Sequence, residues 1–140
     1  VTGVQTCALP ICCDIHIART MVDMTNQENS DCLFCKFARI EIPVEFLYES
    51  DNVFAINDIN PQAPTHVLII PKNHFANGPE LAEAESSTIA EIFKVAKEIS
   101  ASKGLASFRT VFNTGADAGQ TVFHAHLHLL GGRKFAWPPG

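Results

Sequence analysis

Three histidines, His124, His126 and His128, alternate with apolar residues in segment 123–130. Side chains of a β-strand alternate between its two faces, so a strand would place the three imidazoles on one face. A helix would turn neighbouring members of the set by about 200° and scatter them. In a strand, neighbouring imidazoles lie roughly 6.5 Å apart, which suits holding one small anion or dividing the histidines between a metal and a substrate. We therefore predict a strand that carries chemistry; the alternatives are the polar face of an edge strand and a metal-scavenging histidine tract.

Cysteines provide the second candidate for chemistry. Cys32 and Cys35 are three residues apart, a spacing that can direct both thiolates at one ion. The pair alone is compatible with half of a zinc site, a redox pair or two small buried hydrophobic residues. The remaining cysteines, Cys7, Cys12 and Cys13, bring the total to an odd number, which is a poor disulfide framework. We therefore expect a reducing, cytoplasmic setting.

Length and composition limit the class of protein. The 140 residues, 46% hydrophobic and 18% charged, predict one ordinary domain with a substantial core. A net charge of −5 argues against a general nucleic-acid-binding surface but allows a local pocket for one nucleotide. No apolar run approaches the roughly 20 residues of a membrane helix. We expect neither a nucleic-acid partner nor a membrane partner.

Residues 1–30 differ in character from the rest of the chain. They lack the charged start and the continuous apolar stretch of a secretory signal, and residues 1–13 resemble translated adapter sequence. We interpret residues 1–30 as a non-native or disordered extension, with native translation starting near Met21 or Met24. The folded domain would then span residues 31–140.

Apolar patterning predicts the strands that must position the histidines. The predicted strands are residues 46–49, 53–56, 65–71, 108–113 and the histidine strand from Thr121. The first two would form a hairpin around the turn at 50–52. The third is the most apolar of them and is predicted to be central.

Two helical regions accompany these strands. Asp31 is a good N-cap for a short helix within 31–40, where apolar residues recur at helical spacing. The main helical region runs from Pro79 to Lys103 and carries one apolar stripe. The stripe consists of Ile89, Ile92, Phe93, Ala96 and Ile99. Its boundary signals are a capping box at Thr88 and Glu91, alternative starts at Ser86 or Ser87, and Gly104 after its end.

Two loops and the C-terminal tail offer further functional groups. Asp58 could accept hydrogen bonds from a ribose diol, or form an ordinary Asx turn. Loop 114–120 contains two glycines and lies directly before the histidines, so it could hold a phosphate with backbone N–H groups, or be only a hairpin loop. The proline-containing tail carries Trp137, which suggests packing on a partner subunit.

With these motifs assembled, the chain resembles the histidine triad (HIT) superfamily, and most closely its histidine triad nucleotide-binding (Hint-like) branch. The resemblance covers residues 31–140. It rests on the alternating histidines followed by Leu129 and Leu130, and on segments 58–66, 70–74, 119–123, 130–133 and 137–140.

The resemblance implies an α+β, HIT-like fold with a roughly five-stranded antiparallel sheet, one long helix and one short helix. It also implies a homodimer, which we expect to form through the sheet edge and the C-terminal tail including Trp137. The implied activity is hydrolysis of purine nucleoside 5′-phosphoramidates to nucleoside monophosphate and amine through a nucleotidyl-histidine intermediate, without an organic cofactor. The alternatives are a dinucleoside polyphosphate hydrolase and a nucleotide-binding regulatory module with weak catalysis.

Residue roles follow from the same resemblance. His126 is the implied nucleophile, His128 a phosphate ligand and His66 a support for the nucleophile. Thr121, where serine is common in the family, would bond the leaving nitrogen. The implied nucleotide-binding set is Asp58, Ile59, Asn113, Gly119, Gln120, Thr121, His126 and His128. The implied structural zinc ligands are Cys32, Cys35, His74 and His124, a closed Cys₂His₂ set.

Overall fold

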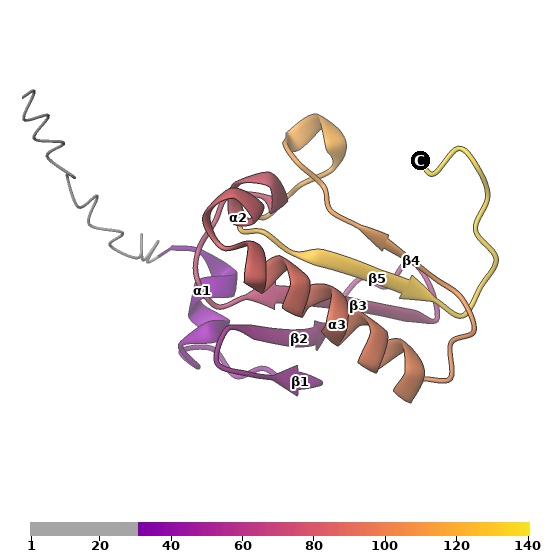
Figure 1. The fold of residues 1–140 in the computed structure, drawn as a ribbon, viewed down its shortest axis with the longest axis horizontal. Helices are drawn as coiled ribbons and strands as arrows, with labels where there is room; N and C mark the ends of the chain where they lie inside the picture. Colours follow the sequence, from indigo (N-terminus) through magenta and orange to yellow (C-terminus); the bar gives the residue numbers. More distant parts are fainter. Residues whose placement is uncertain (1–30) are drawn as a thin grey trace, which may run out of the picture.

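Five antiparallel strands form the sheet that carries the histidines, in a computed structural model that describes residues 31–140. Our interpretation of residues 1–30 lies outside the described residues. The sheet order is β1-β2-β3-β5-β4 (Figure 1). The strands are β1 (Tyr48–Glu49), β2 (Val53–Asn57), β3 (Thr65–Pro71), β4 (Phe108–Val111) and β5 (Leu127–Gly131). The predicted α+β class and five-stranded antiparallel sheet are confirmed.

The central strand β3 has the predicted bounds and sets the register of the site. It pairs with β5 so that Leu68 lies opposite His128 and His66 lies opposite Leu130. His66 and His128 are therefore diagonal neighbours on one face of the sheet. This register brings together two histidines that are 62 positions apart in the chain.

The helices differ in number from the expectation of one long and one short helix. The described residues contain α1 (Leu33–Ala38), α2 (Gly78–Ala84), α3 (Ser86–Ser102) and a 3₁₀ turn η1 (Ala116–Ala118). The helical region predicted from Pro79 to Lys103 is divided at Glu85, whose φ of −138° and ψ of 70° are not helical. The side chain of Asn77 starts α2 by accepting a hydrogen bond from the Glu80 backbone N–H.

Some of the predicted helix boundaries are confirmed and others are wrong. Gly104 follows α3 with φ +66°, as a residue that ends a helix in the left-handed region should. The proposed capping box is wrong, because Thr88 lies inside α3 and its hydroxyl donates to the carboxylate of Glu85. The alternative start at Ser86 is confirmed, because α3 begins at that residue. Asp31 is not the N-cap of α1; Cys32 holds that position and its side chain is turned toward His124 instead.

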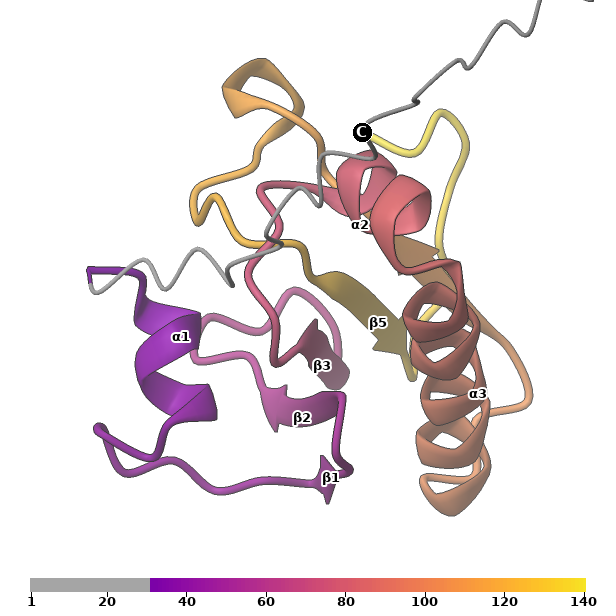
Figure 2. The ribbon, with the colours of Figure 1, turned by 60° about the vertical axis from the view of Figure 1, so that its left-hand side comes forward.

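The sheet separates two unlike layers (Figure 2). On one face, α3 packs on an apolar core that includes Val67, Leu129 and Ile92. On the other face, α1 covers a smaller cluster with Phe34 and Leu68. The predicted apolar stripe of α3 is largely confirmed, but Phe93 is 47% exposed. Val95, which was not part of the predicted stripe, lies in the core instead of Phe93.

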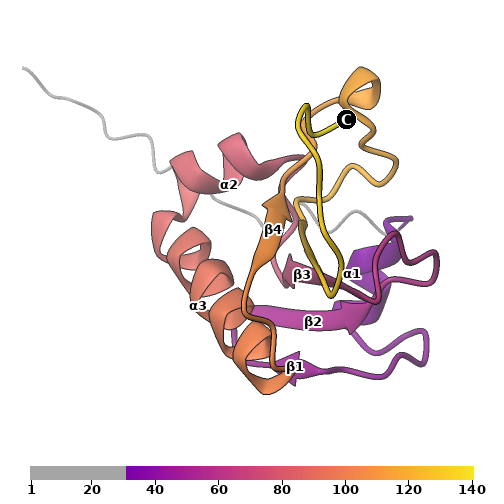
Figure 3. The ribbon, with the colours of Figure 1, turned by 90° about the vertical axis from the view of Figure 1, so that its right-hand side faces the viewer.

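The edge strand β4 and the C-terminal tail lie side by side (Figure 3). The guanidinium of Arg109 on β4 donates to the carbonyl of Ala136 at 2.9 Å. Trp137 is 83% exposed, so its ring is available for a partner surface. The homodimer stays a prediction. Within the described part of the chain, no helix has both the length and the apolar character required to cross a membrane.

Candidate functional site

The histidine segment is a strand over only part of its predicted length. β5 begins at Leu127, so His128 lies in the strand while His124 and His126 precede it. The backbone N–H of Ala125 donates to the carbonyl of Phe75 at 2.7 Å, which directs this stretch away from β3. The alternation of faces is nevertheless retained, because the intervening apolar residues pack in the α3-side core while Phe34 on the α1 side contacts the histidines.

A pocket of about 430 Å³ opens beside His126 and His128, within the usual range for small-molecule sites. One end is apolar, with walls from Leu33, Phe34, Phe37, Val44, Ile56 and Leu68. The other end is polar, with Asp58, His66, Thr121, His126 and His128. The predicted residue Ile59 also lines the pocket and is fully exposed, which places it at the mouth. A ligand with an apolar ring at one end and an anionic group at the other matches these walls.

The protonation of His126 follows from its hydrogen bond. Its Nδ1 lies 2.7 Å from the carbonyl oxygen of His124, and because a carbonyl can only accept, Nδ1 carries the proton. Burial lowers the pKa of His126 below its usual value, so the ring is neutral at pH 7. Nε2 therefore holds a lone pair. His126 meets the requirements of a nucleophile that needs no further deprotonation.

His66 and His128 form a hydrogen-bonded pair beside His126. The backbone N–H of Gln62 donates to Nδ1 of His66, which puts the His66 proton on Nε2. That Nε2 lies 2.9 Å from Nδ1 of His128 and 3.3 Å from a carboxylate oxygen of Asp58. His128 accepts at Nδ1 and so carries its own proton on Nε2. The pair thus supplies a neutral N–H donor in the pocket.

The support that we expect His66 to give to the nucleophile stays a prediction. His66 contacts His128, so any such support passes through His128, whose ring centroid lies 4.9 Å from that of His126. Asp58, His66 and His128 also lie close enough together to hold a metal by spacing alone. Nε2 of His66 carries a proton directed at His128 and Asp58, so it has no lone pair for a metal. These three residues therefore form a hydrogen-bonded chain rather than a metal site.

Loop 114–120 places the remaining predicted residues differently. Thr121 lines the pocket, whereas Asn113, Gly119 and Gln120 are not among its walls. The buried side chain of Gln120 holds the loop together: its oxygen accepts from Gly115 N–H, and its nitrogen donates to the carbonyls of Ala76 and Val122. The backbone N–H of Gln120 also donates within the loop, to the carbonyl of Gly115 at 3.1 Å, so both its side chain and its N–H are engaged in holding the loop.

Sequence reasoning missed the apolar wall that α1 contributes. Leu33, Phe34 and Phe37 served only to predict a short helix within 31–40, yet all three line the pocket. The available signal was their helical spacing next to the Cys32–Cys35 pair, which indicated a face turned toward the site without revealing what it covers.

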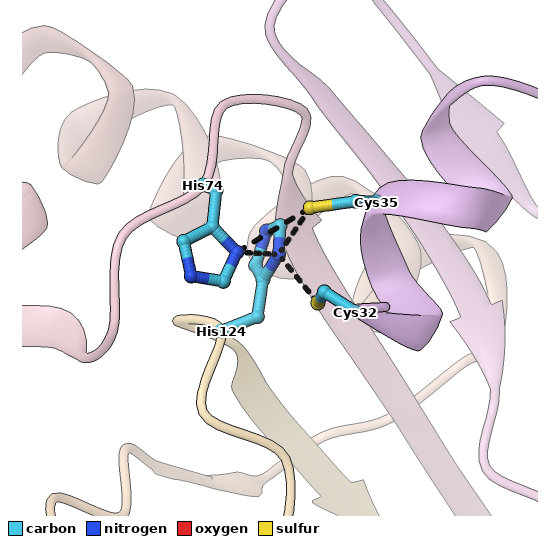
Figure 4. A group of neighbouring side chains, drawn as sticks. All are labelled: Cys32, Cys35, His74 and His124. Carbon is cyan, nitrogen blue, oxygen red and sulfur yellow. Dashed lines mark hydrogen bonds between the residues drawn. The ribbon is translucent and has the colours of Figure 1, made fainter. Parts of the chain in front are cut away.

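Four side chains meet at a second cluster on the same face (Figure 4). Cys32 and Cys35 come from the start of α1, His74 from the loop after β3, and His124 from the segment before β5. Their ligand atoms lie within 4.8 Å of one another. Nδ1 of His124 is 3.4 Å and 3.5 Å from the two sulfurs and 3.1 Å from Nδ1 of His74. The four residues predicted as zinc ligands are thus brought together.

The chemistry of these donors fits a tetrahedral cation. Ordinary zinc–sulfur and zinc–nitrogen lengths place tetrahedral ligand atoms about 3.3–3.8 Å apart, close to the observed separations. Nε2 of His124 donates to the carbonyl of Pro71 at 2.8 Å, so its Nδ1 presents a lone pair to the cluster. Burial lowers the pKa of His124 to about 4, which keeps that lone pair unprotonated. Of the three readings of the Cys32–Cys35 pair, the structure favours half of a metal site.

The sheet, the pocket and the histidine cluster define an α+β protein with a histidine-lined ligand site, and comparison with known proteins identifies its family. The HIT domain family model matches residues 39–135. A HIT family hydrolase from Legionella pneumophila, of known structure, is 48% identical, with a TM-score of 0.75 over 79% of this chain and 100% of that one.

Curated relatives agree with this match. An uncharacterized HIT-like protein of Synechococcus elongatus is 46% identical over 80% of this chain and 99% of its own length. A 14 kDa zinc-binding protein of Zea mays is 41% identical over 81% of this chain and 91% of its own length. The chain belongs to the HIT domain family.

Proposed function

We propose that this protein is a hydrolase that cleaves nucleoside 5′-phosphoramidates, preferentially those of purines, to nucleoside monophosphate and amine. The observation that carries the proposal is the neutral His126 ring, with its proton fixed on Nδ1 and its Nε2 lone pair in a pocket with the donor His128. The Legionella pneumophila neighbour is described as a hydrolase, which supports the same class of activity.

The first step would form a bond between His126 Nε2 and the α-phosphorus and break the P–N bond. The amine leaves with the electron pair of that bond and takes up a proton from solvent water, which the exposed Thr121 hydroxyl lining the pocket would pass on while regaining its own proton. Nδ1–H of His126 remains bonded to the His124 carbonyl, which stabilises the positive charge that develops on the ring.

Charge on the phosphoryl oxygens would be met by His128. Its Nε2–H donates without bringing a full positive charge, because burial lowers the pKa of His128 to about 4. His66 and Asp58 hold the tautomer that makes this donation possible. In the second step, water attacks phosphorus, the Nε2–P bond breaks, and the monophosphate and free His126 result.

The pocket also supports a nucleoside as the remainder of the substrate. Its apolar end offers aromatic and aliphatic walls for a purine base. Asp58 lines the pocket beside His66, and its carboxylate could accept hydrogen bonds from a ribose diol. One oxygen of Asp58 already accepts from the Asn60 backbone N–H, so the Asx turn and a ribose contact can coexist.

Zinc at Cys32, Cys35, His74 and His124 is the second part of the proposal. A bound zinc ion would supply a structural cross-link, because four protein ligands leave no position for substrate. The zinc-binding name of the Zea mays relative supports this assignment. The proposed homodimer would use the β4 edge and the tail with exposed Trp137.

A direct comparison of substrates tests the function. Purified wild-type protein and His126→Ala should be assayed on adenosine 5′-phosphoramidate and on diadenosine polyphosphates. We expect the wild type to prefer the phosphoramidate and the variant to lose turnover while binding adenosine monophosphate. A preference for diadenosine polyphosphates would instead assign the dinucleoside hydrolase activity, and binding without turnover on either would assign a regulatory module.

A further inference from the structure

Phe34 touches both the metal cluster and the pocket. It lies between Cys32 and Cys35 in the sequence and is only 4% exposed. Its ring is edge-on to His124, with centroids 5.8 Å apart, and edge-on to His126, with centroids 5.1 Å apart. The same turn of chain therefore contacts one cluster ligand and the nucleophile.

The turn that carries Phe34 also forms a wall of the pocket. Leu33 and Phe34 line it, while the cysteines on either side point at Nδ1 of His124. α1 has only six residues, and its N-cap makes no side-chain hydrogen bond to the helix start. So short a helix has little stability of its own. A cation held by both sulfurs would fix this wall in place.

His124 provides a second connection between the two sites. Its Nδ1 faces the cluster, and its carbonyl oxygen accepts a hydrogen bond from Nδ1–H of His126, with 2.7 Å between the oxygen and the nitrogen. Its Nε2–H donates to the Pro71 carbonyl, which ties the His124 ring to the backbone at the end of β3. Fixing the ring of His124 thus fixes the acceptor that orients His126.

We propose that metal binding at the cysteine–histidine cluster and nucleotide binding in the pocket are thermodynamically coupled, with Phe34 as the positioning residue. The proposal rests on the proposed function in that the pocket binds nucleotide and the cluster binds a metal. Coupling of this kind is reciprocal: the factor by which metal raises nucleotide affinity equals the factor by which nucleotide raises metal affinity.

The test measures both halves of the coupling with Zn²⁺ and adenosine monophosphate. Calorimetry gives the affinity for adenosine monophosphate in zinc-loaded and in chelated protein, and competition with a chromophoric chelator gives zinc affinity with and without the nucleotide. We expect both affinities to rise by the same factor, about fivefold or more. Equal affinities with and without the second ligand would overturn the proposal.

Two phenylalanine variants separate positioning from simple contact. Phe34→Ala keeps all four metal ligands and the connection through His124, so we expect one zinc per chain and a coupling factor clearly smaller than that of the wild type. Phe37→Ala is the matched control, because Phe37 lines the same pocket but lies outside the cysteine pair. It should weaken nucleotide binding equally with and without zinc and leave the factor unchanged. Undiminished coupling in Phe34→Ala would contradict the role of Phe34.

Cobalt spectroscopy gives a readout that does not depend on the metal-free protein remaining folded. Co²⁺ in the cluster should show visible bands that shift on saturation with adenosine monophosphate in the wild type and in Phe37→Ala, and that shift less in Phe34→Ala. An unchanged wild-type spectrum would overturn the coupling. Coupling without any phosphoramidate turnover would support this inference and contradict the proposed activity, whereas absence of nucleotide binding would contradict both.

Discussion

His124 and His126 are two residues apart and both buried, yet they offer opposite nitrogens. His124 donates Nε2–H to the Pro71 carbonyl and presents Nδ1 to two sulfurs and His74. His126 donates Nδ1–H to the His124 carbonyl and retains its lone pair on Nε2. The nitrogen that meets a backbone carbonyl decides which nitrogen remains for chemistry.

The comparison shows how one short segment can serve two sites. A ligand for a cation and a nucleophile for phosphorus both need a neutral imidazole, and burial lowers the pKa of both rings. The two rings differ in what surrounds the remaining lone pair. That of His124 faces the thiols, whereas His126 lines the pocket with His128.

The largest expected effect comes from removing the lone pair of His126. His126→Ala should lower kcat for adenosine phosphoramidate by about 10⁴-fold or more, since loss of a covalent nucleophile has effects of this size. Affinity for adenosine monophosphate, measured by calorimetry, should stay within a few-fold of wild type. Residual turnover near the wild-type level would show that the two histidines do not differ in the proposed way.

Metal removal tests the role of His124 and the other three cluster residues. Chelation should lower the free energy of unfolding by about 4 kcal/mol relative to protein held at a metal concentration of 1,000 Kd. Chemical denaturation with and without chelator measures this difference. In Cys32→Ser, most of this chelator-dependent difference in the free energy of unfolding should be lost. His66→Asn changes the pocket and leaves the four cluster residues in place, so it should keep the difference. Loss of the difference in His66→Asn would contradict the assignment of the metal to the cluster.

His128 should matter less than His126, because it donates a hydrogen bond and forms no covalent bond. We expect His128→Ala to reduce kcat by about 10²- to 10³-fold, as for removal of one donor to a developing oxyanion. Steady-state kinetics on the same phosphoramidate measures the effect. A reduction as large as that of His126→Ala would assign the two rings a common role.

The smallest effect concerns stability at acid pH. Burial lowers the pKa of His128 to about 4 in the folded protein, against about 6.5 when unfolded. Between these values the unfolded state binds more protons, so the free energy of unfolding should fall as pH falls from 6.5 to 4. Above pH 6.5, His128 is neutral in both states and does not make the free energy of unfolding depend on pH. Thermal unfolding of His128→Asn across this range should show a shallower dependence than the wild type.

Local sequence signals were sufficient where one principle dominates the outcome. The continuous apolar run of β3 and the terminating Gly104 were predicted at their observed positions. The alternation of histidines and apolar residues also predicted the correct faces, although only His128 lies in regular strand. Periodicity reports which way a side chain points even where strand pairing is absent.

Long-range contacts decided what the sequence could not predict. The start of β5 is delayed because the Pro71 carbonyl receives a hydrogen bond from the His124 side chain and Ala125 pairs with Phe75. The carboxylate of Glu85, where the helical region divides, accepts from Asn73 in the loop after β3 as well as from Thr88. Except for Thr88, these partners come from other segments of the chain, which no local pattern contains.

The roles of the site residues were predictable in part. The four cluster residues were grouped correctly through the family resemblance. The expected support of His126 by His66 stays a prediction, and the β3–β5 register makes His66 a neighbour of His128, so such support would pass through His128. Such a relation depends on which strands pair, and the resemblance alone did not specify it.

The stereochemical course at phosphorus tests the central claim most directly. A nucleoside 5′-phosphorothioamidate of one configuration, hydrolysed in ¹⁸O-water, gives a product whose configuration can be read from its ³¹P spectrum after stereospecific phosphorylation. Attack by His126 followed by attack of water makes two in-line displacements, each with inversion, so the proposed mechanism predicts overall retention. Overall inversion would show direct attack by water and contradict a covalent role for His126.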